Sequence, residues 1–325
     1  MGEAIAFPAA SERIRLGVSS CLLGEKVRYD GGHKLDHFLR DTLGQYVEYV
    51  PVCPEVECGL PVPREAMRLV GDPAAPRLVT SRSGVDQTDR MLAWARERVE
   101  RLAEEGVCGF VFKSGSPSSG MERVKVYTPE GMPSKAGVGI FARAFLERFP
   151  LLPVEEEGRL NDPVLRENFI ERLFTLKRWR EMLARGKTRG SLVDFHTREK
   201  LLLLSHSPEH YRTLGRLVAH AKEHEPEDLF AEYQNLLLTA LRLKTTPRKN
   251  ANVLQHCLGY FKDVLSADEK QELLEVIERY RTELVPLVVP VTLVNHYVRK
   301  FGEPYLLRQT YLNPHPVELQ LRNHV

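Results

Sequence analysis

The chain has 325 residues, of which 42% are hydrophobic and 28% charged, with a formal net charge of +2. This composition excludes a disordered or strongly basic protein, and the length suits two domains. The most apolar run, residues 284–294, is too short for a spanning helix, which needs roughly 20 residues. No secretory signal is predicted, and five cysteines argue against a disulfide framework, so we expect a cytoplasmic protein.

The first half of the chain alternates between predicted strands and helices. Short apolar runs predict strands over residues 14–19, 46–52, 108–112 and 123–127. A helix is predicted over residues 88–106, with Met91, Ala95, Val99 and Leu102 on one face and Gly106 as its stop signal. Strands separated by helical stretches indicate an α/β, Rossmann-like domain with a mostly parallel sheet.

From about residue 160 the pattern becomes helical almost throughout. Helices are predicted over residues 162–183 and 266–284, and Ser266 with Glu269 forms a capping-box signature at the start of the second. One face of that second helix is expected to carry Leu273, Leu274, Ile277, Tyr280 and Leu284. We therefore predict a flexible lead over residues 1–13, an α/β domain over 14–155 and an all-α domain over 160–325.

Three of the predicted strands end in loops with unusual chemistry. The first is followed by Cys21, the second by Cys53, and the third by the serine-rich stretch "KSGSPSSG" at residues 113–120. In an open α/β sheet, ligands bind outside the carboxyl ends of the strands. The three loops are therefore expected to meet in one place.

Two thiols at that place have more than one interpretation. Thiolates hold zinc or iron–sulfur clusters, but zinc sites usually show two ligands at short spacing, and Cys53 with Cys58 is only a weak match. Cysteines on separate strands suit a cluster held between loops better. The alternative is that both are buried structural thiols that act as small hydrophobic residues.

Three segments resemble the signature segments of the TudS-type thiouracil desulfidases: "SSCLLGEKVRYDGGHK", "PVCPEVECGLPVPRE" and "KSGSPSSGMERVKVY". The segments "GRLNDPVLRENFIERLF", "SHSPEHYRTLGRL", "NVLQHCLGYFK" and "YLNPHP" resemble a helical domain of unknown function that is fused to this module in some bacteria. The resemblance runs over nearly the whole chain from Ile14 onward. It implies an enzyme that removes sulfur from 4-thiouridine in tRNA or from its monophosphate.

The resemblance also implies a cofactor and a set of site residues. A [4Fe–4S] cluster would be held by three cysteines, two of which correspond to Cys21 and Cys53. Its fourth iron would bind the thiocarbonyl sulfur as a Lewis acid, without a redox step. Glu55 would activate the water that replaces the sulfur, and Ser116 would orient this base or relay a proton.

The chain departs from the family pattern at the third cluster ligand, where the family has cysteine and this chain has Ser119. A serine oxygen is a harder and poorer ligand for iron than a thiolate. Three explanations are open. In the first, Ser119 still binds iron. In the second, a spare thiol (Cys58 or, less favoured, the strand residue Cys108) replaces it. In the third, the cluster is absent and the loop binds a substrate phosphate through Lys113 and backbone amides.

Other residues are predicted to contact substrate or RNA. Lys113, Ser114, Arg28 and Arg64 are candidates for substrate binding, although Arg28 also suits a surface turn and Arg64 also suits a loop brace. His206 and His210 are interpreted as structural or surface residues.

A basic run in the second half contains Arg242, Lys244, Arg248 and Lys249, with no acid between residues 233 and 261. Such a run is usually a solvated face, but it also suits the phosphate backbone of tRNA. No membrane association and no obligate protein partner are predicted. The rival to a desulfidase is a non-catalytic RNA-binding or regulatory protein that has lost its cluster, and a serine hydrolase is a distant third.

Overall fold

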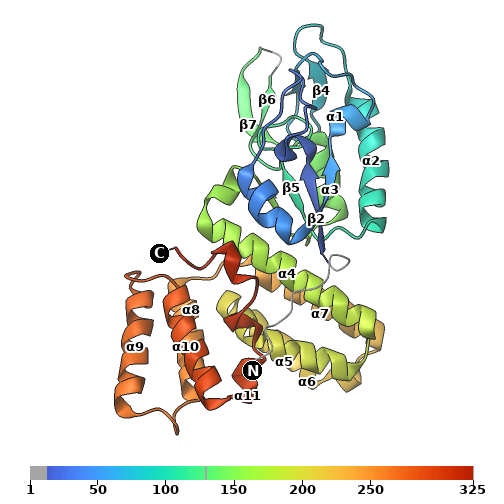
Figure 1. The fold of residues 1–325 in the computed structure, drawn as a ribbon. Coiled ribbons are helices and arrows are strands. Elements are labelled where there is room, and N and C mark those ends of the chain that lie inside the picture. Colours follow the sequence, from blue (N-terminus) through green and yellow to red (C-terminus); the bar gives the residue numbers. More distant parts are fainter. Residues whose placement is uncertain (1–12, 129, 325) are drawn as a thin grey trace. The chain divides into compact units, whose positions relative to one another are not determined.

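A computed structural model describes residues 13–128 and 130–324. The chain divides into two compact units between Asn161 and Asp162. The N-terminal unit contains the strands, and the C-terminal unit is helical (Figure 1). None of the helices within the described residues has both the length and the apolarity needed to cross a bilayer.

The main sheet of the N-terminal unit is fully parallel, with the strand order β2-β1-β5-β8. Its strands are β1 (Ile14–Ser19), β2 (Val47–Val52), β5 (Phe110–Phe112) and β8 (Val154–Glu156). The chain moves from β1 outward to β2, and later to β5 on the other side of β1. The sheet therefore has a topological switch point between β1 and β5, where open α/β sheets bind their ligands.

A second, mixed sheet has the strand order β4-β3-β6-β7. Its strands β3 (Met67–Val70) and β4 (Arg77–Thr80) come between β2 and helix α2, whereas β6 (Val124–Tyr127) and β7 (Pro133–Gly137) come between β5 and helix α3. The sequence predicted β6 but not that it belongs to a separate sheet. The pairing of β3 with β6, which joins the two local hairpins of this sheet, connects residues far apart in the chain, and periodicity does not report such a contact.

Helices α2 (Thr88–Glu104) and α3 (Ile140–Arg148) pack together in the core of this unit (Figure 1). The predicted face of α2 is confirmed, because Met91, Ala95, Val99 and Leu102 are all buried. The α3 residues Phe141 and Phe145 contact the rings of Phe110 and Phe112 on β5. This aromatic cluster fixes β5, and with it the loop that follows β5.

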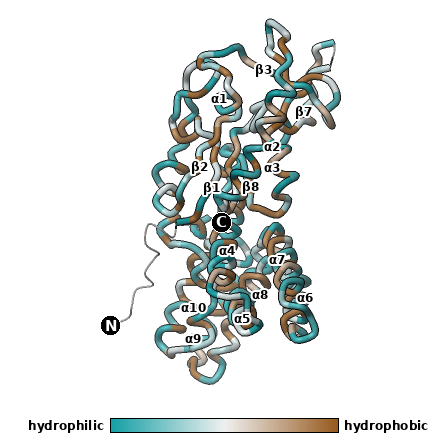
Figure 2. The backbone as a smooth tube through the Cα atoms, turned by 90° about the vertical axis from the view of Figure 1, so that its right-hand side faces the viewer, coloured by the Kyte–Doolittle hydropathy of each residue, from teal (hydrophilic) through white to brown (hydrophobic). Residues whose placement is uncertain are grey.

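The C-terminal unit is built from eight α-helices in its described residues. They are α4 (Pro163–Arg185), α5 (Arg189–His206), α6 (Pro208–Ala219), α7 (Pro226–Arg242), α8 (Pro247–Gly259), α9 (Ala267–Arg281), α10 (Val288–Phe301) and α11 (Pro304–Leu307). Along these helices hydrophobic and hydrophilic stretches alternate, as expected of amphipathic helices (Figure 2). The all-α prediction is confirmed for this unit.

A buried group of charged side chains joins α4, α5 and the C-terminal segment. Arg322 donates to Glu167 at 3.1 Å and to Glu171 at 2.9 Å, and both glutamates lie on α4. His206, at the end of α5, places one ring nitrogen 3.2 Å from Glu171 Oε2 and the other 2.7 Å from the Leu243 carbonyl oxygen. Both ring nitrogens of His206 therefore face acceptor oxygens, and the contact with Glu171 holds the end of α5 against α4.

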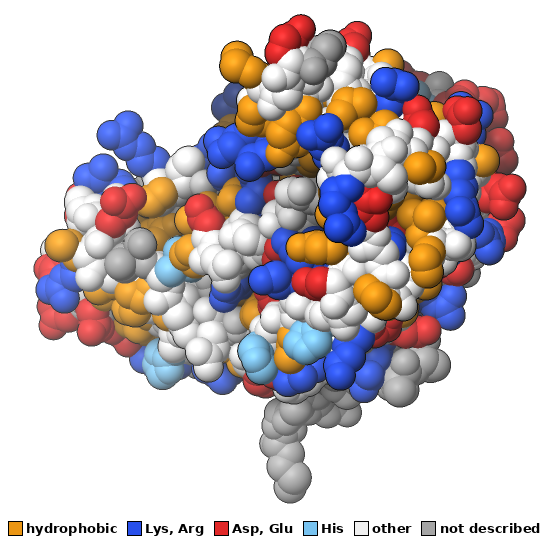
Figure 3. Space-filling view, turned by 90° about the horizontal axis from the view of Figure 1, so that it is seen from above, with side chains coloured by type: hydrophobic (Ala, Val, Ile, Leu, Met, Phe, Trp, Pro, Cys, Tyr) orange, Lys and Arg blue, Asp and Glu red, His pale blue; other side chains and the backbone are white. Residues whose placement is uncertain are grey.

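The surface carries mixed charge. On the face shown in Figure 3, Lys and Arg side chains lie among acidic and apolar ones, in keeping with the net charge of +2. Any nucleic-acid footprint must therefore come from a local group of basic residues rather than from the global charge.

The predicted start of α9 is confirmed in detail. The Ser266 hydroxyl accepts from the Glu269 amide at 3.2 Å, and Glu269 Oε2 accepts from the Ser266 amide at 2.8 Å. The prediction of its buried face is wrong for two of the five residues, because Leu274 is 36% and Leu284 is 73% exposed. Leu284 lies beyond Arg281, where the helix ends and its periodicity no longer applies.

Replacing Ser266 with alanine should lower the free energy of unfolding of the helical unit by about 1 kcal/mol. The reason is that the Glu269 amide, in the first turn of α9, loses its hydrogen-bond acceptor. The measurement is the urea midpoint followed by circular dichroism. Gln271→Ala, on the exposed side of the same helix, is the matched control. Equal midpoints for Ser266→Ala and the control would contradict the capping role.

Candidate active site

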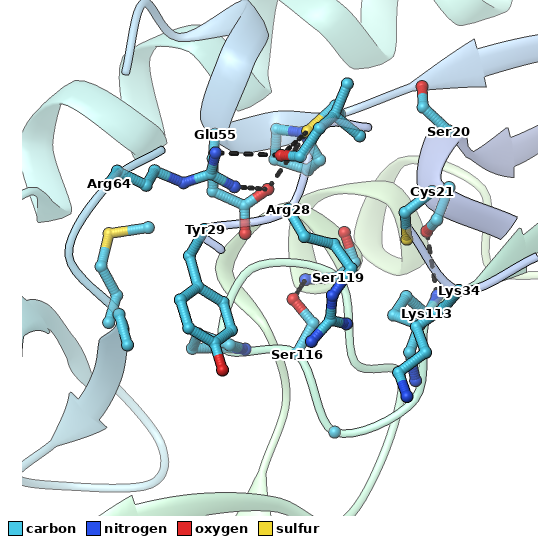
Figure 4. A pocket seen from close by; sticks show the side chains of 18 of the residues that line it. Ser20, Cys21, Arg28, Tyr29, Lys34, Glu55, Arg64, Lys113, Ser116 and Ser119 are labelled. Carbon is cyan, nitrogen blue, oxygen red and sulfur yellow. Dashed lines mark hydrogen bonds and ion pairs between the residues drawn. The ribbon is translucent and has the colours of Figure 1, made fainter. Parts of the chain in front are cut away.

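A cavity of about 380 Å³ lies at the carboxyl end of the parallel sheet. Cys21 follows β1, Cys53 follows β2, and the serine loop (residues 113–120) follows β5. All three segments line the cavity, as their positions after parallel strands predict (Figure 4).

Most of the predicted site residues line this one cavity. They are Cys21, Arg28, Cys53, Glu55, Arg64, Lys113, Ser114, Ser116 and Ser119. Cys58 is half-buried, and its thiol donates to the Glu55 carbonyl oxygen at 3.3 Å, so it does not face the cavity in the described structure. Cys108 lies at the other end of β5, where its amide donates to the Arg15 carbonyl oxygen at 2.7 Å.

The two cavity thiols are held in a nearly dry environment. Cys21 and Cys53 are each 8% exposed. Burial raises the pKa of Cys21 to about 11 and that of Cys53 to about 12, and the nearby Glu55 carboxylate adds to both shifts. Such thiols are protonated at neutral pH unless a metal displaces the proton, so they are poor nucleophiles but suitable metal ligands.

The residues that the resemblance assigns to the cluster offer two sulfurs and one hydroxyl oxygen. Ser119 is 3% exposed and lines the cavity with the two thiols. Iron–sulfur clusters are held by cysteine thiolates, so the positions of Cys21 and Cys53 fit a cluster and the oxygen of Ser119 is the one unusual donor. The residues present therefore fit an iron–sulfur cluster held by two thiolates and a serine oxygen.

Cys53 is braced by a pair of charged side chains that the sequence did not indicate. Its amide donates to Glu57 Oε1 at 2.9 Å, and Arg98 donates to the other oxygen of Glu57 at 3.1 Å. Glu57 belongs to the short helix α1 (Pro54–Glu57), which also carries Glu55. One turn of helix thus supports a thiol ligand and presents the candidate base.

Glu55 projects into the cavity between serine hydroxyls and a guanidinium group (Figure 4). Its Oε1 accepts from the Ser118 hydroxyl at 2.6 Å, and its Oε2 lies 3.6 Å from Arg64 and 3.6 Å from the Cys53 sulfur. Arg64 also donates to the Val27 carbonyl oxygen at 3.0 Å, so it braces the first loop while it faces Glu55. Ser118 was not among the predicted site residues.

The serine loop is anchored by acids at the end of β8 that we did not predict as functional. Glu157 accepts from the Ser114 amide at 2.7 Å and from the Ser114 hydroxyl at 2.8 Å, and it pairs with Lys113. Glu156 accepts from the Met121 amide at 2.7 Å, and burial raises its pKa. The run "VEEE" (residues 154–157) lies where the sequence predicted the boundary between the two domains, but two of its carboxylates hold the two ends of the loop.

The ammonium group of Lys113 is already fully used within this network. It donates to the Ser114 carbonyl oxygen at 2.9 Å, to the Ser114 hydroxyl at 3.0 Å and to Glu157. An ammonium group has three donors, so none is left for a substrate phosphate without rearrangement. Arg28 and Lys34 also line the cavity, and Arg28 is held only loosely, 3.5 Å from Asp30.

Comparison with known proteins gives a family for each unit. The profile of the 2-thiouracil desulfurase family matches residues 16–157, and that of DUF1722, a protein family of unknown function, matches residues 200–316. The chain therefore belongs to the 2-thiouracil desulfurase family through its N-terminal unit, and its C-terminal unit carries a DUF1722 domain.

Three individual proteins are similar to parts of the chain. The uncharacterized protein YbgA of Escherichia coli K12 is 33% identical over 153 residues, which cover 47% of this chain and 90% of YbgA. The uncharacterized protein YbbK of Bacillus subtilis 168 is 30% identical over 108 residues, which cover 32% of this chain and 71% of YbbK. A solved structure, the [4Fe-4S]-dependent thiouracil desulfidase TudS, is 34% identical over 46% of this chain and 95% of its own, with a TM-score of 0.38.

The glycine at position 139 controls how closely α3 approaches the serine loop. A Cβ atom there would lie 2.5 Å from the carbonyl carbon and oxygen of Ser118, closer than real Cβ atoms come. Gly139→Ala should therefore displace the loop and lower the melting temperature, with an overpacking cost of about 1–3 kcal/mol.

The matched control is Gly259→Ala, because no atom lies within 4 Å of a Cβ at that helical position. Thermal melting should show a loss for Gly139→Ala only, and hydrogen exchange should rise in the serine loop. Unchanged exchange in that loop would contradict the tight contact.

Proposed function

We propose that this protein is an iron–sulfur-dependent desulfidase that converts the thiocarbonyl of a thiolated pyrimidine to a carbonyl, with 4-thiouridine in tRNA or 4-thio-UMP as substrate. The observation that carries the proposal is the cavity that gathers Cys21, Cys53, Glu55 and the serine loop. Family membership supports the substrate class, and the resemblance of the three signature segments supports a [4Fe–4S] cluster as cofactor.

Cys21 and Cys53 would hold the cluster, with Ser119 as the third ligand. The chemistry that the cluster supplies when bound is Lewis acidity toward the thiocarbonyl sulfur. The overall reaction adds one water and releases hydrogen sulfide, so no oxidant or reductant is needed. Arg28 and Lys34 at the cavity would bind a substrate phosphate, since Lys113 is saturated by its own contacts.

Glu55 would act as the general base toward the attacking water. The Glu55 side chain lines the cavity, and its Oε2 lies 3.6 Å from Arg64. A base must lie within hydrogen-bond reach of the proton it removes, and a water bound between Oε2 and the substrate carbon satisfies that requirement. Ser116, which also lines the cavity, would orient the substrate or this base (Figure 4).

Iron and acid-labile sulfide per chain after anaerobic reconstitution test the cofactor. We expect about four of each in the unaltered protein, and a cluster that survives air longer in Ser119→Cys, because a thiolate binds iron better than a serine oxygen. Cys58→Ala is the matched control and should keep its iron, since that thiol faces the Glu55 carbonyl oxygen.

Two results would count against this assignment. A cluster that forms only in Ser119→Cys would leave the unaltered protein without its cofactor and favour a non-catalytic RNA-binding role. Loss of iron in Cys58→Ala would show that Cys58, rather than Ser119, is the third ligand. Loss of thiocarbonyl absorbance from 4-thio-UMP and from 4-thiouridine in tRNA measures the activity itself.

The C-terminal unit would contact the tRNA backbone. Arg242, Lys244 and Arg248 are exposed around the start of α8, and a helix N-terminus favours phosphate. Lys249 is different, because its ammonium group donates to the carbonyl oxygens of His206 at 2.7 Å and Lys244 at 2.9 Å. Burial also lowers the pKa of Lys249, so we propose that it braces the loop that displays the other three.

Reversing Arg242, Lys244 and Arg248 to glutamate should weaken tRNA binding and leave 4-thio-UMP turnover unchanged. The slope of log affinity against log salt should fall in magnitude by about 2, because three phosphate contacts are lost. The control reverses the exposed Lys270, Arg279 and Arg299, which changes the net charge by the same amount. Equal weakening by both triple variants, or equal loss of mononucleotide turnover, would contradict a specific RNA surface.

A further inference from the structure

A chain of hydrogen bonds runs through the serine loop to Glu55. The hydroxyl oxygens of Ser116 and Ser118 are 3.0 Å apart, and Ser118 Oγ is 2.6 Å from Glu55 Oε1. Ser116 and Glu55 line the cavity, whereas Ser118 is fully buried behind it. Ser118 is thus the internal link between two groups that face the substrate.

The direction of each hydroxyl in this chain follows from the lone pairs. Ser116 Oγ accepts from the amides of Ser119 at 3.1 Å and Ser118 at 3.3 Å, which uses both of its lone pairs. Its proton must therefore be donated to Ser118 Oγ. The Ser118 proton is then donated to Glu55 Oε1, and this bond orients the carboxylate.

Ser118 cannot easily move away from this position. Its carbonyl oxygen accepts from the amides of Phe141 at 2.9 Å and Ala142 at 3.2 Å, in the first turn of α3. Gly139 packs against the same carbonyl group with no room for a side chain. The helix therefore fixes Ser118, and the Ser118 hydroxyl fixes the carboxylate.

We propose that Ser118 is the positioning residue for Glu55. Its hydrogen bond to Oε1 fixes the rotation of the Glu55 carboxylate, which holds Oε2 beside Arg64 and Cys53, and its own oxygen accepts the Ser116 proton. This role rests on the proposed function, in which Glu55 is the general base. Ser118 itself touches neither substrate nor cofactor, because it does not line the cavity in the described structure.

Ser118→Ala tests this role by its effect on kcat relative to KM. We expect kcat for 4-thio-UMP to fall about 10- to 100-fold, as for a misplaced catalytic group, while KM and iron per chain stay unchanged. The matched control is Ser205→Ala, because Ser205 is also fully buried and donates to a backbone oxygen, that of Leu202. The control should retain full kcat.

A double-mutant cycle separates positioning from general damage to the fold. In a Glu55→Ala background, Ser118→Ala should cause no further loss of kcat, because Ser118 acts only through Glu55. Losses that multiply, a rise in KM, or loss of iron in Ser118→Ala alone would overturn the positioning role. If Ser118→Ala does not fold, the cycle is run with Ser116→Ala and Glu55→Ala, because the coupling between these two residues passes through the intact Ser118. Losses of kcat that are independent in this second cycle would also overturn the positioning role.

The same data distinguish failure of this role from failure of the proposed function. Full activity in Glu55→Ala would remove Glu55 as the base, and the positioning role would fall with it. A large loss in Glu55→Ala with none in Ser118→Ala would overturn only the role of Ser118.

Discussion

The parallel pairing of β1 with both β2 and β5 is the constraint on which the candidate site depends. It places Ser19, at the end of β1, next to the end of β5, where its hydroxyl accepts from the Lys113 amide at 2.9 Å. It also puts the segments after β1 and β2 side by side, so that Cys21 and Cys53 share a cavity although they are far apart in the chain. Addition of β8 beside β5 then supplies the carboxylates that hold the serine loop.

In the C-terminal unit, a buried group of charged and polar side chains connects segments that are far apart in the chain. Arg322 donates to both Glu167 and Glu171, and His206 lies within hydrogen-bond distance of Glu171, so each buried carboxyl group has a polar partner. Burial and the neighbouring carboxylate raise the pKa of Glu167, whereas donors from His206 and Arg322 lower that of Glu171 against the effect of burial. Removing one member would leave an uncompensated charge, so the group ties α4, α5 and the C-terminal segment together.

Much of this arrangement could be predicted from the sequence, because it follows from local patterns. Strand β1 was predicted with its observed bounds, and the meeting of three loops follows from the rule for parallel strands. The second sheet could not be predicted, because β3, β4 and β7 are short and the pairing of β3 with β6, which joins its two hairpins, spans a long stretch of the chain. The sequence also offers four serines in one loop without indicating which hydroxyl meets Glu55, since that depends on how Gly139 and α3 pack against the loop.

The cavity draws its walls from both sheets of the N-terminal unit. Cys21, Cys53 and the serine loop follow strands of the parallel sheet, whereas Met67 begins β3 of the second sheet and Ala66 precedes it. A substitution at Met67 can therefore change the shape of the cavity while the parallel sheet keeps Cys21, Cys53 and the serine loop in place.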